Sequence, residues 1–143
     1  MVLRHQLKRA GMALLVAMTL GAAPAQADYA ADSNAIHNGP CTKEAENRKV
    51  TLDITPRPVR HMQELTFRVT MAPAKQIPST LILDLSMPGM VMGKNQVTLK
   101  KRPDGAWEGK GIIVRCMSGR TLWKATLLSS ELGNPAFSFN VRD

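Results

Sequence analysis

The chain has 143 residues, with 19 Lys and Arg against 11 Asp and Glu, six aromatic residues, nine Met and two Cys. This length suggests one domain and argues against a large multidomain enzyme. A hydrophobic content of 44% is ordinary for a globular protein and too high for a disordered one.

The N-terminus has the pattern of an export signal. A basic opening at residues 4–9 precedes an apolar run at residues 10–23 and the small residues of Ala25-Gln26-Ala27. This order predicts a signal peptide over residues 1–27, cleaved after Ala27, and a periplasmic mature protein. The alternative is an uncleaved anchor, but a run of about 14 residues is short of the ~20 that span a bilayer, so we expect no stable membrane span after cleavage.

The positive charge is reduced once the signal is removed. Residues 28–143 contain 16 basic and 11 acidic side chains, a net charge of +5. The basic residues are scattered along the sequence, and the one run, Lys100-Lys101-Arg102, adjoins the turn signal Pro103-Asp104-Gly105. A solvated hairpin end explains that run as well as a phosphate-binding patch, and an exported chain is not expected to bind nucleic acid.

The rest of the chain reads as an all-β domain. Residues 28–46 are polar and aperiodic, which predicts a flexible N-terminal segment before a domain at residues 47–143. β-rich stretches, several with period-two alternation, predict strands near residues 50–54, 65–71, 81–86, 97–100, 107–115, 121–128 and 137–141. About seven antiparallel strands without a helical stripe predict an immunoglobulin-like β-sandwich.

Cys41 and Cys116 are the only cysteines and stand 75 positions apart. In an exported protein such a pair most simply forms a disulfide. The alternative is that both thiolates bind a soft metal ion such as Cu(I).

Three of the six Met of residues 28–143 lie in Met87-Pro88-Gly89-Met90-Val91-Met92. Pro-Gly predicts a turn that folds Met87 back toward Met90, while Met90 and Met92 point the same way in an extended segment. Three converging thioethers would suit Cu(I), because thioether sulfur is a soft, neutral ligand. The alternative is that this Met-rich loop only fills one end of the fold.

Other soft or nitrogen ligands are available on loops. His61 and Met62 are adjacent, and Met117 follows Cys116. Sequence spacing does not decide whether these residues share an end of the fold with residues 87–92, and single loop histidines are usually only solvated.

Catalysis is not expected. No His stands near a Ser, Cys or Asp in a nucleophile–base pattern, and the carboxylates mostly occupy outward strand positions. An accessory domain of an enzyme has no positive support in the sequence.

Residues 48–142 resemble the YtkA-like/FixH-like family of small exported or membrane-tethered bacterial proteins. The resemblance rests on the motif at residues 87–92, on Trp107-Glu108-Gly109-Lys110-Gly111 and on Leu122-Trp123-Lys124-Ala125-Thr126. It implies an immunoglobulin-like β-sandwich outside the cytoplasm and, in some members, copper handling or assembly of copper-containing respiratory oxidases. The cleavage site and the two Cys depart from the anchored oxidase-assembly members and favour a free periplasmic protein.

Two functions follow as hypotheses. The first is a periplasmic Cu(I)-binding protein that exchanges the ion with a metal-trafficking partner. Its expected ligands are Met87, Met90 and Met92, with His61, Met62 and Met117 as additional candidates and Cys41 and Cys116 either ligands or a disulfide. The second is a non-catalytic β-sandwich module that binds a protein partner or stabilises an envelope complex, with a structural disulfide.

Overall fold

The computed structural model describes residues 33–143. The signal peptide expected at residues 1–27, its alternative as an uncleaved anchor and residues 28–32 lie outside the described residues. Within residues 33–143, no helix has the length and apolar character needed to cross a membrane.

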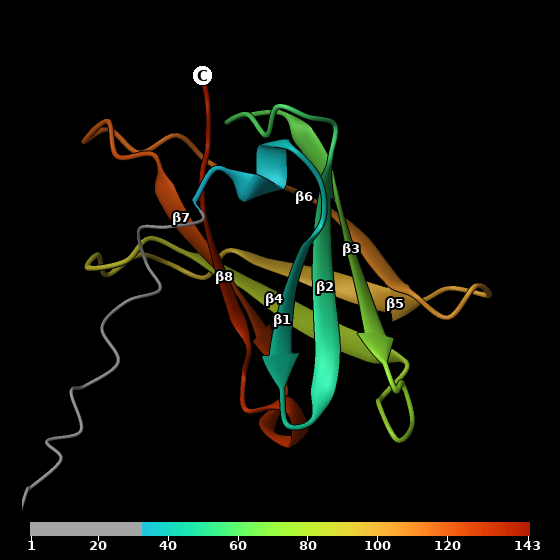
Figure 1. Ribbon diagram of the computed structural model, residues 1–143. Coiled ribbons are helices and arrows are strands. Elements are labelled where there is room, and N and C mark those ends of the chain that lie inside the picture. The colour runs from blue at the N-terminus through green and yellow to red at the C-terminus, as the bar shows by residue number, and fades with distance from the viewer. Residues whose placement is uncertain (1–32) are drawn as a thin grey trace, which may run out of the picture.

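The described chain is all-β, as expected. Its strands are β1 (Cys41–Ala45), β2 (Arg48–Thr55), β3 (Glu64–Ala72), β4 (Thr80–Ser86), β5 (Gln96–Lys101), β6 (Trp107–Ile112), β7 (Leu122–Leu128) and β8 (Ala136–Asn140). Every pairing between them is antiparallel, in one sheet of order β1-β2-β3-β6-β5-β4-β7-β8 (Figure 1). The two short 3₁₀ turns, η1 (Ala35–His37) and η2 (Ser130–Leu132), are the only helical elements among these residues, which contain no α-helix.

All seven expected strands are present, and β1 is an eighth. The sheet therefore begins at Cys41, inside the segment for which the sequence predicted no strand. Residues 42–44 of β1 are all exposed. In this edge strand, buried and exposed residues therefore do not alternate, and the sequence lacks the apolar–polar alternation by which a half-buried strand is predicted.

The sheet is nearly closed, because residues before β1 reach β8 at the other end of the strand order. Ser33 O accepts the backbone N–H of Asn140 at 2.7 Å, and His37 Nε2 lies 2.8 Å from Asn140 O. Farther along, the Lys43 ammonium lies 5.8 Å from the ring centroid of Phe137. These contacts join the two edges into a barrel-like sheet with one continuous core.

The core follows the inward face of each strand. Leu81, Leu83 and Leu85 of β4 are buried, as are both tryptophans. The Trp107 indole N–H donates to Pro78 O at 2.8 Å, so its polar atom is satisfied inside the core.

β5 and β6 approach each other unusually closely. They share only two paired positions, beside the turn that joins them. Beyond that turn, a Cβ on Gly109 would lie 2.2 Å from Thr98 O, and a Cβ on Gly111 would lie 2.6 Å from Val97 Cγ2. Two glycines on one face of β6 therefore let β5 cross over it.

Antiparallel pairing divides the connecting segments between two ends. We call one the sulfur end, formed by residues 33–40, 56–63, 87–95, 113–121 and 141–143. The other, the far end, is formed by residues 46–47, 73–79, 102–106 and 129–135. In Figure 1 the sulfur end lies at the top and left, and the far end at the bottom and right.

Candidate metal centre

The topology brings every candidate ligand loop to the sulfur end. The end of β4 pairs beside the start of β7, so the loop of residues 87–95 adjoins the loop of residues 113–121. The start of β3 pairs with the end of β6, and Met62 N–H donates to Ile113 O at 2.9 Å. Cys41, the first residue of β1, also lies at the sulfur end. Residues far apart in the chain thus share one end of the fold.

The Pro-Gly turn forms as expected. Met90 N–H donates to Met87 O at 3.1 Å, and Gly89 has a φ of 75°, which glycine adopts without a Cβ penalty. The turn reverses the chain directly after β4.

Met87, however, does not join its neighbours at the surface. It is 3% exposed and belongs to the hydrophobic core. The physical reason is that Met87 continues the inward alternation of Leu81, Leu83 and Leu85 by one more position. The expected convergence of three thioethers at the rim is therefore wrong for Met87.

Met90 and Cys116 form a sulfur pair at the sulfur end. Met90 is 36% exposed, and its Sδ lies 3.9 Å from the thiol Sγ of Cys116. On its other side the Cys116 Sγ lies 2.9 Å from Ser118 Oγ. A thioether from one loop and a thiol from the next are thus within reach of one ion.

The surroundings of Cys116 favour its thiolate. Hydrogen bonds from the Ser118 hydroxyl and backbone, followed by the positive charge of Arg120, hold the pKa of the Cys116 thiol below its ordinary value. The Arg120 guanidinium also lies beside Gly89, with Nη1 3.9 Å from the position a Cβ would take there. The thiolate is the form of Cys that binds metal ions. The loop of residues 113–121 therefore favours the form of Cys116 that could act as a soft ligand.

The other sulfur candidates differ in exposure. Met92 is half-buried and, like Cys116 and Cys41, packs against the core. Met62 and Met117 are exposed to solvent. Cys116 is a free thiol in the structure, so a disulfide between Cys41 and Cys116 stays a prediction.

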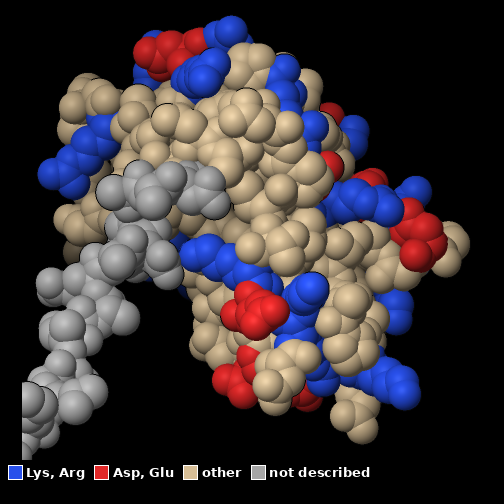
Figure 2. Space-filling model, in the orientation of Figure 1, with Lys and Arg blue, Asp and Glu red and all other residues tan. Residues whose placement is uncertain are grey.

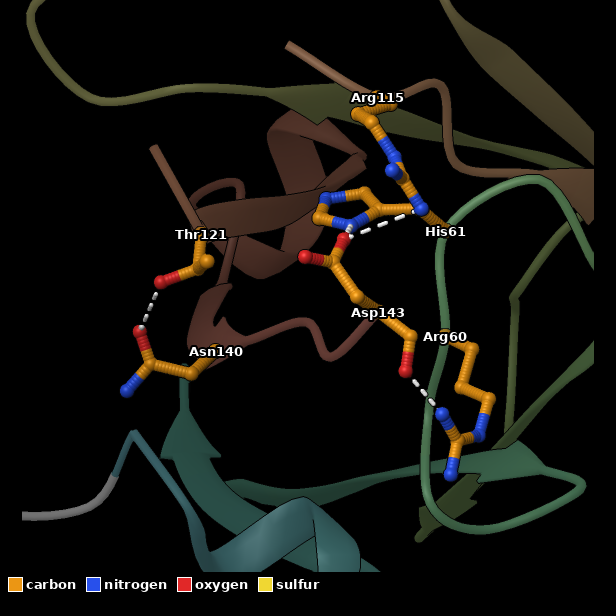
Figure 3. A network of polar contacts seen from close by, with 6 residues as sticks. All are labelled: Arg60, His61, Arg115, Thr121, Asn140 and Asp143. Atoms are coloured by element: carbon orange, nitrogen blue, oxygen red, sulfur yellow. Dashed lines mark hydrogen bonds and ion pairs between the residues drawn. The ribbon is translucent and has the colours of Figure 1, made fainter. Parts of the chain in front are cut away.

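His61 is buried, contrary to the expectation of a solvated loop histidine. Its side chain is 2% exposed, and Nδ1 lies 3.3 Å from Asp143 Oδ1 (Figure 3). The same carboxylate oxygen lies 3.2 Å from Arg115 Nη2, and Arg60 donates to the Asp143 backbone oxygen. This network fixes the ring, yet Nε2 is buried with no hydrogen-bond partner.

His37 has a different role. Its Nδ1 accepts the backbone N–H of Val59 at 3.2 Å while Nε2 donates to Asn140 O. Both bonds together require the neutral ring with its proton on Nε2. This histidine closes the barrel and is not available as a ligand.

Two features of the site were missed by the sequence reasoning. The Ser118 hydroxyl hydrogen-bonds with the Cys116 thiol, and a hydroxyl two residues beyond a cysteine is a signal that could have been used. The contact of Asp143 with His61 spans 82 positions, and no local pattern could have shown it. Among residues 33–143, no three His, Cys, Asp or Glu side chains gather in a way that could hold a metal ion.

No protein-family model matches the chain, and neither a curated protein nor a solved structure matches it.

Proposed function

We propose that the protein is an exported, non-catalytic Cu(I)-binding protein of the periplasm that passes the ion to a metal-trafficking or envelope protein. The observation that carries the proposal is the 3.9 Å separation of Met90 Sδ and Cys116 Sγ. Metal–sulfur bonds are about 2.3 Å long, and two such bonds at tetrahedral to trigonal angles would hold the sulfurs about 3.8–4.0 Å apart. The pair therefore fits one soft ion.

The chemistry of the two ligands supports exchange. A thiolate binds Cu(I) and releases its proton, while a neutral thioether binds at any pH. Since Met90 is partly exposed, a partner's ligand could reach the ion from solvent. Bound Cu(I) would be held as a soft cation without a redox step.

Further ligands are at hand on the same end. Met92 is the half-buried neighbour of Met90 in sequence, Met117 adjoins Cys116, and Met62 follows His61. His61 offers a buried imidazole nitrogen that lacks a partner, which is the kind of group that calls for an ion or a water.

We also propose that the barrel-like sheet is an immunoglobulin-like sandwich, as the sequence predicted. With only two paired positions between β5 and β6, the sheet separates into halves, β1-β2-β3-β6 and β5-β4-β7-β8. Val97 lies over Gly111 across the two halves, as a residue does between facing sheets. This arrangement agrees with the resemblance to YtkA-like/FixH-like proteins, which we keep as part of the proposal.

The test is Cu(I) titration of the mature protein under anaerobic, reducing conditions, against a competing chelator. The double variant Met90→Ile/Cys116→Ser should bind at least about 100-fold more weakly, because even changes beyond the ligands themselves cost 10- to 100-fold. Met71→Leu is the matched control, since Met71 is a buried thioether on β3. Unchanged affinity in the double variant would reject the sulfur pair as the site.

The second candidate function is a non-catalytic module that binds a partner or stabilises an envelope complex, with Cys41 and Cys116 as a structural disulfide. The burial of Met87 favours it, because one of the three clustered thioethers serves packing. Wild-type protein that binds no Cu(I) in this titration, and a mass lower by two hydrogens, would support the second candidate.

A further inference from the structure

The two ends of the fold differ in charge. The sulfur end carries six basic residues, Arg57, Arg60, Lys94, Arg115, Arg120 and Arg142, and one acidic residue, Asp143. The far end carries two basic residues, Lys75 and Arg102, and three acidic ones, Glu46, Asp104 and Glu131. The net charge is therefore +5 at one end and −1 at the other. Figure 2 shows basic side chains along the upper margin and on the left of this face, with acidic atoms among them at the top, and both signs interspersed toward the right and the bottom.

Four of the six cations form no ion pair with a described carboxylate, and one of these, Arg60, donates to the Asp143 backbone oxygen. The other three are Lys94, Arg120 and Arg142. Lys94 shares the loop of Met90, and Arg120 lies beside the Met-Pro-Gly turn. Two cations without an ion pair, Lys94 and Arg120, thus belong to the two loops that carry Met90 and Cys116.

Exposed apolar side chains gather at this same end. Seven large hydrophobic residues are exposed in the described chain: Met62, Met90, Val91, Ile112, Val114, Met117 and Leu128. Five of them lie in the loops of the sulfur end and Ile112 ends β6 beside them, whereas Leu128 ends β7 at the far end. Val91 and Met117 are each fully exposed.

We propose that the sulfur end is a docking surface for an acidic protein partner. The partner would place carboxylates against Lys94, Arg120 and Arg142, and apolar side chains against the exposed Met and Val. Arg and Met are the residue types enriched at protein interfaces, and Met adapts its shape to a partner. Five of the six cations are Arg.

The exposed residues of the sulfur end fit a protein partner better than a lipid membrane. Interfacial anchors bury Trp, Phe or Leu among lipid head groups. All described Trp and Phe side chains are buried in the core, and the exposed Leu128 lies at the far end. A second copy of the chain is also disfavoured, because two ends of the same positive sign repel each other.

The proposal goes beyond Cu(I) binding, because the charge and the apolar groups are present without metal. It is tested on metal-free mature protein with a synthetic peptide of alternating Asp and Met as the probe, followed by ¹H–¹⁵N NMR. We expect saturable shift changes confined to the five segments of the sulfur end. The double variant Lys94→Glu/Arg120→Glu should weaken binding about tenfold or more, since reversal replaces attraction by repulsion. A Lys-for-Asp peptide should not bind.

The matched control is Lys75→Glu/Arg102→Glu, which reverses two exposed charges of the far end. Equal weakening in both double variants, shifts centred on the far end, or no binding of the acidic peptide would overturn the proposal. Binding to phosphatidylglycerol vesicles but not to the peptide would identify a lipid surface instead. Wild-type protein that binds the acidic peptide but does not bind Cu(I) would reject the metal site and leave the docking surface standing.

Discussion

The sulfur end and the far end of the barrel are built from the same eight strands, yet they differ in how their polar groups are satisfied. At the far end, Asp104 accepts the N–H of Ala106 at 3.0 Å and binds Arg68, while Asn134 accepts the N–H of Ser129 at 2.8 Å. These turns are closed by their own neighbours. Their contacts explain why the chain reverses direction there and leave little for a partner.

The sulfur end is different, because polar groups on it or next to it stay unsatisfied. Among the side chains of residues 33–143, the buried nitrogen and oxygen atoms without a hydrogen-bond partner are His61 Nε2, Asn95 Nδ2 and Trp123 Nε1. His61 and Asn95 lie in the loops of the sulfur end, and Trp123 is the second residue of β7, which starts there. Native proteins satisfy nearly all such groups, so a concentration of exceptions marks the end where an ion, water or partner is expected. The comparison teaches that function is to be sought where internal pairing is incomplete.

The largest expected effect separates two Met of the same turn. Met87→Ala should lower the free energy of unfolding by about 2–5 kcal/mol, since it removes a buried side chain and leaves a cavity. Met90→Ala should change it by less than about 0.5 kcal/mol, as surface substitutions usually do. Urea denaturation followed by tryptophan fluorescence measures both. Similar losses in the two variants would remove the distinction between a core thioether and a ligand thioether.

The next effect concerns closure of the barrel. His37→Ala should destabilise the protein by about 1–3 kcal/mol, because the backbone N–H of Val59 and the carbonyl of Asn140 both lose their partner. Asn38→Ala is the control at an exposed neighbouring position. Thermal unfolding distinguishes them; an equal melting temperature for the two variants would show that His37 does not hold the edges together.

A smaller effect is expected at the far end. The Arg68 hydrogen bond, and then that of the Ala106 backbone, hold the pKa of the Asp104 carboxyl below its ordinary value. A pKa lowered by folding contributes stability above the unfolded value of about 3.8, and this contribution disappears as the pH falls through the folded pKa. Asp104→Asn should therefore be less stable than wild type at pH 6, and this difference should shrink as the pH is lowered from 6 to 2. A constant difference across that range, in urea melts, would contradict this.

The smallest effect is one of reactivity. Because the pKa of Cys116 is lowered in the folded protein, its iodoacetamide alkylation should reach half its maximal rate at a lower pH than in urea-unfolded protein. Ser118→Ala should move that midpoint upward, because it removes the side-chain hydrogen bond that favours the thiolate. Peptide mapping by mass spectrometry assigns the reaction to Cys116. A midpoint that does not respond to Ser118→Ala would remove the hydroxyl as the cause.

Much of the fold could be predicted from local pattern, because half-buried strands record the inside and outside of the sheet in alternate residues. The exposed strand β1 was missed, since the three residues at its centre all face solvent. The same alternation, carried one position past β4, would have placed Met87 in the core.

The site depended on information that no local pattern holds. The Pro-Gly turn was predictable, but the approach of Met90 to Cys116 joins residues 26 positions apart through the pairing of β4 with β7. The basic residues look scattered in the sequence because they occupy separate loops. Only the antiparallel topology gathers six of them at one end.

Gly109 and Gly111 have a consequence for how the sequence can change. At either position the smallest side chain would meet the backbone of Thr98 or the side chain of Val97 at a distance that atoms do not tolerate. A saturation library should therefore accept almost nothing but glycine at these two positions, while the exposed loop residues Val91 and Met117 admit many replacements without loss of folding. The crossing of β5 over β6 thus restricts these two positions to glycine, while the exposed loops can change in sequence without loss of the fold.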